Sequence, residues 1–423
     1  MTFDALTRDQ LQALHDDQQA KYDALKAAGL TLDLTRGKPS PEQLDLSSDL
    51  LTLPGPDFKD SKGIDTRNYG GIEGLTELRA IFAEILHLPV EQVVAGDNAS
   101  LAMMHDSLVF ALLRGTPDSP RPWVEEDEVT FICPVPGYDR HFALTEQYGI
   151  RMAPVEMRPD GPDMTAVREL AADPSVKGMW LVPTYSNPTG AVVSEAVAAE
   201  LAAMETAAPD FRIFWDNAYA VHHLTEQRTK TPDIAGLSAA SGHPNRPILF
   251  ASTSKITFAG SGVCFLGSSE ENVAWYLRLL GKRTIGPDKL NHLRHARHLR
   301  DLDGVLDLMD RHRAILAPKF AAVLEILEDR LGGHGVATWS EPKGGYFVSL
   351  DVVDGTASRV VELCKEAGIA LTPAGSSFPH GQDPRDRNIR IAPSFPSIDD
   401  LRAAMDGLAT CVLLAAAEKQ LAS

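Results

Sequence analysis

The sequence ASTSKITFAG at residues 251–260 sets a single lysine, Lys255, among small hydroxyl residues. It directly follows the apolar run at residues 247–250, which predicts a buried strand. We therefore expect Lys255 at the carboxyl end of a strand, where open α/β sheets form their ligand sites. A lysine that is partly removed from water there can lose its proton near neutral pH and attack a carbonyl group. When this stretch is considered by itself, a surface lysine on a loop is the alternative.

The composition of the chain is that of a soluble globular protein. It has 423 residues, of which 44% are hydrophobic and 23% charged, and this length predicts two domains. The net charge of −18 argues against a nucleic-acid or anionic-membrane partner, because phosphate groups attract the opposite charge.

The amino-terminal 25 residues form a polar amphipathic pattern that lacks the apolar core of a secretory signal. No run approaches the 18 apolar residues typical of a membrane span. The four cysteines lie far apart and form no Cys-x-x-Cys pair, so we expect reduced thiols, most of them buried, and no metal site. These features predict a cytoplasmic protein.

Short apolar runs alternate with helical patterns between about residues 93 and 267, and polar residues follow these runs. This alternation predicts a mostly parallel α/β sheet. From about residue 290 the chain changes to long charged helices, followed by a smaller α+β set that includes residues 343–350 and 388–393. We place the boundary between the two domains in the helical region of residues 290–320.

Several predicted strands are followed by residues suited to bind a ligand. Asp216 follows the strand at residues 211–215, although a carboxylate at this position can also cap a helix. Residues 97–100 precede an apolar helix, whose first backbone N–H groups can hold a phosphate or can be capped by these side chains. Arg36 and Lys38 flank a glycine, which fits either a plain turn or contact with an anionic substrate.

Four motifs occur in a fixed order along the chain: SNPTG at residues 186–190, DNAY at 216–219, STSK at 252–255 and NIR at 388–390. Through them the chain, over about residues 30–400, resembles the fold-type-I pyridoxal-phosphate aminotransferases of class I. Two further phrases are similar to the aspartate aminotransferase subgroup that is related to the aminotransferase half of MocR regulators: TRGKP at 35–39 and RTIGPDKLN at 283–291.

This resemblance implies an α/β fold of fold type I, with a mostly parallel seven-stranded sheet sandwiched by helices and a smaller α+β domain. It implies three segments: residues 1–45 join the small domain, 46–290 form the large cofactor-binding domain, and 291–423 form the long connecting helix and the small C-terminal domain. It also implies a homodimer with shared active sites.

The resemblance assigns the reacting groups to five residues. Lys255 would form a Schiff base with pyridoxal 5′-phosphate and shuttle the proton between Cα and C4′. Asp216 would keep the pyridinium nitrogen protonated, so that the ring stays an electron sink. Asn187 and Tyr219 would hydrogen-bond the 3-oxygen of the ring. Tyr138, which follows a rigid turn, would stack on the ring face, although it could also be a core tyrosine.

The phosphate of the cofactor would lie on the backbone amides at the start of a helix, with hydroxyl groups from the lysine loop. The residues that the resemblance implies for this task are Asn98, Ala99, Ser100, Ser252 and Ser254. Tyr69 matches the tyrosine that reaches the phosphate from the neighbouring subunit.

The substrate would be held mainly by Arg390, whose planar guanidinium suits a carboxylate. Gly37 matches the glycine that lines the substrate pocket, and Arg36 and Asn187 would contact the substrate as well.

One position departs from the family pattern. Family members place an arginine eight residues after the Schiff-base lysine, where it neutralises the phosphate, whereas this chain has Val263. Either Ser261 supplies a neutral hydrogen bond or a cation comes from elsewhere. Lys289 and Arg283, from this chain or its partner, are the candidates.

These features predict a ping-pong aminotransferase that acts on small molecules, an amino acid and a 2-oxo acid. The cations that could meet a second carboxylate favour aspartate or glutamate as the donor; they are Arg36, Lys38, Arg283 and Lys289. A pyridoxal-phosphate lyase or decarboxylase on the same scaffold is the enzymatic alternative. A non-catalytic MocR-like regulator is a third hypothesis, which the acidic composition and the short stretch before residue 30 disfavour.

Overall fold

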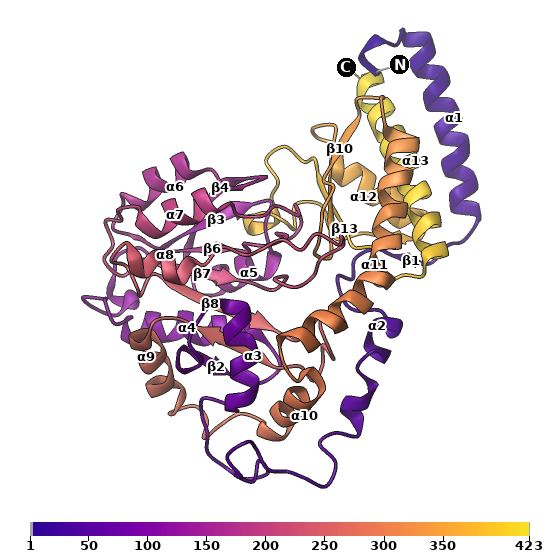
Figure 1. Ribbon diagram of the computed structural model, residues 1–423. Helices are drawn as coiled ribbons and strands as arrows, with labels where there is room; N and C mark the ends of the chain where they lie inside the picture. Colours follow the sequence, from indigo (N-terminus) through magenta and orange to yellow (C-terminus); the bar gives the residue numbers. More distant parts are fainter. Residues whose placement is uncertain (1–2, 423) are drawn as a thin grey trace.

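The computed structural model describes residues 3–422 and is built around one eight-stranded sheet (Figure 1). The strands follow the order β2-β9-β8-β7-β6-β3-β4-β5. The five strands from β8 to β4 pair in parallel, whereas β9 runs antiparallel to both of its neighbours. In sheet order, the strand bounds are Val93–Ala95, Cys264–Gly267, Pro247–Ser252, Arg212–Asp216, Val176–Leu181, Thr130–Val135, Arg151–Arg158 and Gly161–Pro162.

The predicted fold class is confirmed, with one correction to the number of strands. The prediction of seven strands misses β5, which pairs antiparallel with the end of β4. This strand consists only of Gly161 and Pro162, and neither residue type gives the apolar signal by which strands are recognised. The mostly parallel sheet therefore stands, with a two-residue addition at one edge.

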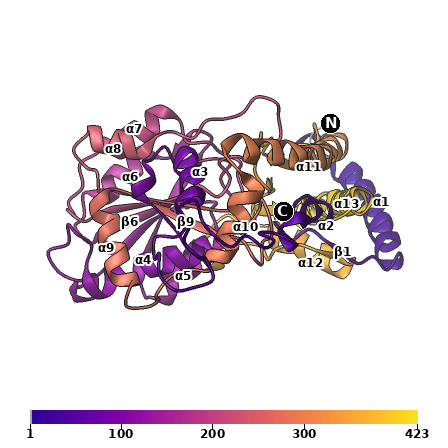
Figure 2. The ribbon, with the colours of Figure 1, turned by 60° about the horizontal axis from the view of Figure 1, so that its bottom comes forward.

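Helices cover both faces of the sheet, which gives three layers (Figure 2). The helices of one face are α3 (Thr76–Leu86), α6 (Met164–Ala171), α7 (Glu195–Ala203) and α8 (Ile234–Ala240). Those of the other face are α4 (Ser100–Arg114), α5 (Asp139–Gln147) and α9 (Glu270–Leu280). Because both faces are covered, β6 and β7 are buried along their whole length, and the residues of β7 between its charged ends form an uninterrupted apolar run.

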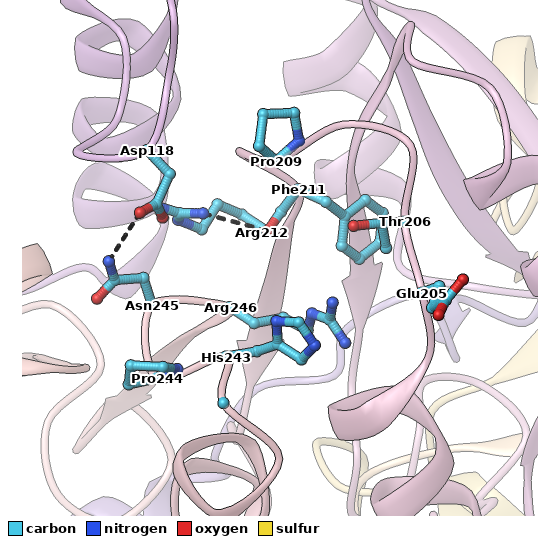
Figure 3. Close-up of a pocket in the computed structure, with 11 residues that line it drawn as sticks. Asp118, Glu205, Thr206, Pro209, Phe211, Arg212, His243, Pro244, Asn245 and Arg246 are labelled. Carbon is cyan, nitrogen blue, oxygen red and sulfur yellow. Dashed lines mark hydrogen bonds and ion pairs between the residues drawn. The ribbon is translucent and has the colours of Figure 1, made fainter.

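The amino ends of β7 and β8 lie at the edge of the sheet opposite to the predicted catalytic edge and border a pocket of about 410 Å³ (Figure 3). The buried Arg212 pairs with Asp118, whose other oxygen accepts a hydrogen bond from Asn245 at 3.1 Å. Arg246 donates to two carbonyl groups in the last turn of α7, where a cation stabilises the end of a helix. Both arginines therefore have structural partners.

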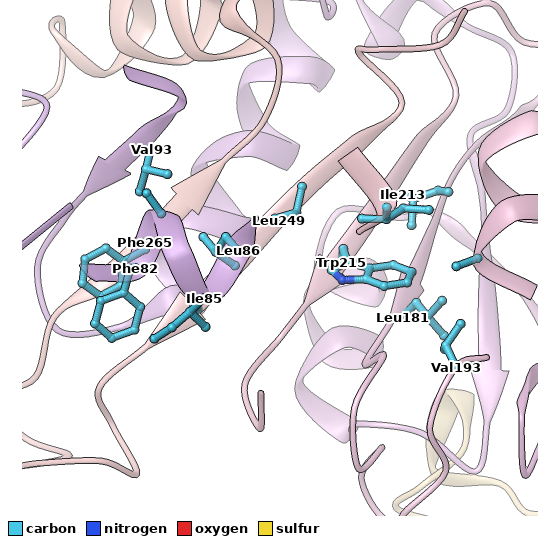
Figure 4. Packing of buried hydrophobic residues seen from close by; sticks show 14 of the residues in the cluster. Phe82, Ile85, Leu86, Val93, Leu181, Val193, Ile213, Trp215, Leu249 and Phe265 are labelled. Atoms are coloured by element: carbon cyan, nitrogen blue, oxygen red, sulfur yellow. The ribbon is translucent and has the colours of Figure 1, made fainter. Parts of the chain in front are cut away.

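The core of the first face joins α3 to the strands beneath it (Figure 4). Phe82 of α3 stacks on Phe265 of β9, with ring centroids 3.7 Å apart and an interplanar angle of 11°. Leu181 at the end of β6 and Trp215 in β7 continue this core and are almost completely buried. The packing fixes the carboxyl ends of the two strands that lead to the predicted ligand loops.

A second hydrophobic core lies in the other part of the molecule (Figure 1). It contains α1 (Arg8–Ala27), the later part of α11 (Leu302–Leu331), α12 (Ala357–Glu366), α13 (Ile398–Ala422) and an antiparallel sheet. This sheet has the order β10-β11-β13, with bounds Ala337–Trp339, Val348–Val352 and Asn388–Ile391. A parallel pair, β1 (Leu32–Asp33) with β12 (Ile369–Ala370), attaches the N-terminal segment to this part.

The region that was predicted to hold long helices contains two, α10 (Lys289–Leu299) and α11. They separate at Arg300, which has a φ of 67°, and at Asp301, whose carboxylate accepts a hydrogen bond from the Gly304 N–H at 2.8 Å and caps α11. The predicted domain boundaries at residues 45 and 290 stay predictions. Shorter segments fill the connections: α2 at Pro41–Asp45, and 3₁₀ turns at Phe3–Ala5, Ser48–Leu51, Val90–Gln92, Trp123–Glu125 and Pro379–Gly381.

The four cysteines are buried free thiols, in agreement with their prediction as reduced core residues: Cys133, Cys264, Cys364 and Cys411. Within residues 3–422, no helix combines the length and the apolarity that crossing a bilayer requires.

A buried ion pair near the start of β7 offers a test of the fold. Asp210 is fully buried; it pairs with Lys177 at 3.0 Å and accepts hydrogen bonds from Trp123 and Ser119, both at 2.7 Å. We expect Asp210→Ala to lower the free energy of unfolding by about 3 kcal/mol, because it removes one of the two carboxylates that pair with the buried Lys177 and the acceptor of the Trp123 and Ser119 hydrogen bonds. Urea unfolding of the purified variant measures the change.

The matched control is an exposed pair, Arg402 with Glu325, in which both side chains are about half exposed. Glu325→Ala should change the free energy of unfolding by less than about 0.5 kcal/mol, because water screens this pair. Equal losses in the two variants would contradict the assignment of Asp210 as a buried anchor.

Candidate active site

The loops that follow β6, β7 and β8 meet at the carboxyl edge of the sheet and enclose a pocket of about 200 Å³. Parallel pairing brings these strand ends together, because Leu181 lies opposite Trp215 and Asp216 lies opposite Phe250. The pocket is lined by Ala99, Ser100, Leu101, Tyr138, Val182, Asn187, Asp216, Ala218, Tyr219, Ser252, Ser254 and Lys255. The structure thus brings together all of the predicted cofactor residues except Asn98 and Tyr69.

The lysine of the pocket is close to an aromatic ring and a carboxylate. Lys255 Nζ lies 5.1 Å from the centre of the Tyr219 ring. Burial lowers the pKa of Lys255, and the negative charge of Asp216 acts in the opposite direction. The amine is therefore easier to deprotonate than an exposed lysine, as nucleophilic chemistry requires.

Asp216 is held by one oxygen and leaves the other without a partner. Its Oδ2 lies 3.0 Å from His141 Nε2, and the His141 ring stacks on Trp180 with centroids 4.5 Å apart. Its Oδ1 is buried and receives no hydrogen bond within the described residues, and the same is true of Asn187 Oδ1. Buried acceptors of this kind are costly unless a donor reaches them, so both atoms mark a place for a ligand.

His141 was not among the residues predicted from the sequence, although it lies only three residues after Tyr138. Its signal is weak, because it falls in the first turn of an ordinary amphipathic helix, α5. A histidine at such a position is recognised as functional only when the fold brings Asp216, 75 residues further on, to its ring.

The two tyrosines of the pocket keep their hydroxyl protons at neutral pH. Burial raises the pKa of Tyr138 to about 12, and burial also raises the pKa of Tyr219. Both hydroxyl groups can therefore donate hydrogen bonds to a ligand in the pocket.

The start of α4 lies at one end of the pocket. Ala99 is the N-cap residue, and it makes no side-chain bond to the helix, so the first N–H groups stay open to an anion. Asp97, which could have capped the helix, instead accepts a hydrogen bond from the Asp288 N–H at 3.0 Å. Ser254 Oγ donates to Asn98 O at 3.4 Å, which places Asn98 directly behind the pocket wall.

The groups suggested as substitutes for the missing arginine lie away from this pocket. Val263 is buried in the core, and the carbonyl of Ser261 accepts a hydrogen bond from Asn291. Arg283 pairs with Asp106 at 2.9 Å, and Lys289 Nζ donates to Tyr69 O at 3.2 Å. Among the residues that line the pocket, Lys255 is the one cationic side chain.

Tyr69 lies on the surface, with 83% of its area exposed. It borders a separate pocket of about 590 Å³ together with Lys289 and Ile64. Within this chain it does not line the Lys255 pocket.

Of the predicted substrate residues, Asn187 lines the Lys255 pocket, whereas Arg390, Gly37 and Arg36 lie near Phe347 or Phe395. The Arg390 guanidinium is 4.9 Å from the Phe347 ring, donates to Asp139 at 3.1 Å, and has a buried Nε without a partner. A Cβ on Gly37 would lie 2.1 Å from the same ring, so only glycine fits there.

The two cations that flank Gly37 have partners within the chain. Arg36 pairs with Asp33 at 2.5 Å and lies 5.6 Å from the Phe395 ring, and Lys38 Nζ lies 4.4 Å from that ring. Neither of them lines the pocket of Lys255.

The chain is similar to known proteins over nearly its whole length. The family described as aspartate amino-transferase matches residues 6–423. The chain is 62% identical to a putative aminotransferase of Mycolicibacterium smegmatis over 99% of both chains. It is 58% identical to an aspartate aminotransferase of Corynebacterium glutamicum, which covers 98% of this chain and 96% of that protein.

Solved structures show the same fold. The crystal structure of an aspartate transaminase from Corynebacterium glutamicum matches with a TM-score of 0.97 at 56% identity, over 99% of both chains. The α-aminoadipate aminotransferase of Thermus thermophilus, solved with N-(5′-phosphopyridoxyl)-L-leucine, matches with a TM-score of 0.72 at 21% identity, over 92% of this chain and 93% of that one. The second match shows a common fold.

The opposing effects of burial and of the Asp216 charge on the pKa of Lys255 can be separated by mutation. The Asp216 charge raises the pKa of Lys255, so in Asp216→Asn burial acts without this opposition and the pKa should fall further. The Lys255 amine should then stay reactive to a lower pH than in the wild type. The pH dependence of acylation of Lys255 in the cofactor-free protein, followed by mass spectrometry of its peptide, measures this shift.

Asp310→Asn, which removes a surface carboxylate paired with Arg228, is the control and should leave the midpoint in place. An unchanged or higher midpoint in Asp216→Asn would contradict the prediction that the Asp216 charge raises the pKa of Lys255.

Proposed function

The chain belongs to the aspartate aminotransferase family, and from this premise we propose that it transfers the amino group of aspartate or glutamate to a 2-oxo acid, using pyridoxal 5′-phosphate bound in the Lys255 pocket. The observation that carries the proposal is the unpartnered Oδ1 of Asp216, which lies in the same pocket as the amine of Lys255. The proposed donor follows the name of the Corynebacterium glutamicum relative.

The residues present fit this cofactor. A pyridine ring needs a carboxylate that can hold a proton on its nitrogen, and Asp216 Oδ1 is a buried acceptor without a donor. A phosphate needs N–H donors, and the open start of α4 supplies them, with Ser252 and Ser254 nearby. An aldehyde needs an amine of lowered pKa, which Lys255 provides.

When bound, pyridoxal phosphate supplies an electron sink that stabilises negative charge at the α-carbon of the substrate. Lys255 Nζ would bind the cofactor and, as a neutral amine, would remove and return the proton at that α-carbon. Asp216, oriented by His141, would hold the proton on the ring nitrogen. Tyr219 and Asn187 would orient the ring by hydrogen bonds, and Tyr138 would cover one face of it.

Substrate binding would rest on Arg390. Its guanidinium is stacked on Phe347, and its buried Nε lacks a partner, so a carboxylate could satisfy it. Asp139 accepts a hydrogen bond from this guanidinium, so a substrate carboxylate would have to replace Asp139 as the acceptor for part of the group. Gly37 keeps space for the Phe347 ring that supports the arginine.

We further propose a homodimer in which each site takes Tyr69 from the partner. Tyr69, Ile64 and Ile285 are more than half exposed, which is unusual for side chains of their size and apolarity. The Tyr69 carbonyl also accepts a hydrogen bond from Lys289 Nζ, at 3.2 Å. Brought across a two-fold axis, this pair would add a cation to the phosphate site, where the position of the family arginine is held by Val263.

The first experiment tests the cofactor and the reaction. After incubation with pyridoxal phosphate and gel filtration, the protein should stay coloured, and borohydride should attach the pyridoxyl group to the peptide that contains Lys255. Aspartate or glutamate should discharge the colour and release the matching 2-oxo acid. Lys255→Met should lose both results, because no amine remains to bind the aldehyde.

Lys319→Met, which removes another buried lysine far along the chain, is the control and should retain the reaction. Release of carbon dioxide in place of the oxo acid would favour a decarboxylase, and absence of bound cofactor would refute the proposal.

The second experiment tests the shared site. Tyr69→Ala and Lys255→Ala chains are each expected to be nearly inactive alone. Mixed after partial unfolding, they should recover about a quarter of the wild-type activity, because half of the random dimers hold one site with native Lys255 and native Tyr69. If each chain formed its own complete site, mixing would recover nothing.

A further inference from the structure

Beneath the pocket, two neighbouring carbonyl groups of the lysine loop depend on side chains from distant parts of the sequence. The carbonyl of Lys255 accepts from Tyr346 OH at 3.4 Å and lies 3.3 Å from His222 Nε2. The carbonyl of Ile256 lies 2.9 Å from His312 Nε2. The loop has left β8 at this point, and in the described part of the chain no backbone N–H donates to either carbonyl. Buried carbonyls require donors, so these side chains determine where the loop lies.

Gln43 connects His312 and Tyr346, two of the side chains that contact these carbonyl groups. Its Nε2 lies 2.8 Å from His312 Nδ1 and 2.9 Å from Tyr346 OH, and its Oε1 accepts the N–H of Ser40 at 3.1 Å. Gln43, His312 and Tyr346 all have no measurable exposure. Every polar atom of the glutamine amide is therefore used, and water does not reach the set.

The chemistry of the amide fixes the direction of these hydrogen bonds. An amide nitrogen has two protons to donate, so His312 Nδ1 must accept and its Nε2 must carry the proton that goes to the Ile256 carbonyl. In the same way Tyr346 OH accepts from Gln43 and donates to the Lys255 carbonyl. Burial lowers the pKa of His312 to about 4, which keeps the ring neutral, as this arrangement requires.

We propose that Gln43 is a positioning residue for Lys255: through His312 and Tyr346, it holds the carbonyl groups of residues 255 and 256 and so aims the amine into the pocket. The proposal rests on the proposed function of Lys255 as the reacting amine. Gln43 lies in α2, outside the sheet, and is not among the residues that line the Lys255 pocket.

Gln43→Met tests this role, because methionine has a similar size but cannot donate a hydrogen bond. We expect kcat for transamination to fall by about tenfold or more, since small displacements of a reacting group have effects of this size. KM for the amino acid should change less than about twofold, because Arg390 is not touched. In the cofactor-free protein, the pH midpoint of Lys255 acylation should also shift, which is a readout that needs no bound cofactor.

Gln18→Met is the matched control. Gln18 is also buried, in α1, and its amide bonds to Asp17 and not to the lysine loop. We expect both variants to lose some thermal stability, but only Gln43→Met to change kcat and the reactivity of Lys255. If the two variants behave alike in both readouts, the role of Gln43 is structural and the proposal is overturned.

Two variants of His312 provide a rescue test. His312→Phe removes both ring nitrogens and should reproduce the Gln43→Met effect. His312→Gln keeps one acceptor and one donor, and should recover at least part of kcat and of the normal Lys255 midpoint. Equal activity of His312→Phe and His312→Gln would contradict the proposed connection of Gln43 to the lysine loop through His312. If the wild type proved unable to transaminate, the proposed function would fail, while the Lys255 acylation midpoints would still decide the role of Gln43.

Discussion

The structure depends on the placement of a lysine and a carboxylate, removed from bulk water, at the ends of two adjacent parallel strands. Each group alone would be costly to bury in charged form, and each lowers that cost for the other. The parallel register of β7 and β8 makes this possible, because it sets Asp216 opposite Phe250, just before the loop that carries Lys255. Burial keeps the lysine pKa low, and the carboxylate prevents it from falling further. The balance suits an amine that must alternate between neutral and protonated forms.

Most of the residues that line the pocket could be predicted because they follow apolar strands in short contiguous motifs. Asp216, Asn187 and Lys255 each lie within a few residues of a strand end, and parallel strands bring their ends to one edge. The partners of these residues could not be predicted in the same way. His141 is 75 residues from Asp216, and Gln43 is 269 residues from His312, in segments whose patterns are those of ordinary helices. Such contacts follow from packing, which a single sequence does not specify. The β5 strand was missed for a local reason, since it has no apolar residue of its own.

Val263 stands at the position where family members have the arginine that neutralises the phosphate. A cation for the phosphate would therefore have to come from another position. The residue is completely buried against the core of the first face, and its N–H donates to Thr253 Oγ1 at 2.9 Å. Burying a long cationic side chain in this apolar core would be costly, so the position serves packing. The N–H groups of α4 and two serines can hold a phosphate, but they leave most of its charge unbalanced. That imbalance is the physical reason why, in the dimer that we propose, the missing cation would come from the partner subunit, since Lys289 adjoins the exposed Tyr69.

The α11 helix connects the pocket to the rest of the molecule. Its first turns contribute Val305, Leu308 and Met309 to the core around the large sheet, whereas Phe320, Val323 and Leu327 belong to the second core. His312 lies between these two sets, and this is where it meets Gln43 and the carbonyl of Ile256. Tyr346 approaches the same point from the chain that leads into β11 of the small sheet. The contacts that hold the lysine loop therefore lie where the two cores meet. A buried glutamine with every hydrogen bond satisfied thus links α2, α11 and the lysine loop at the place where the two cores meet.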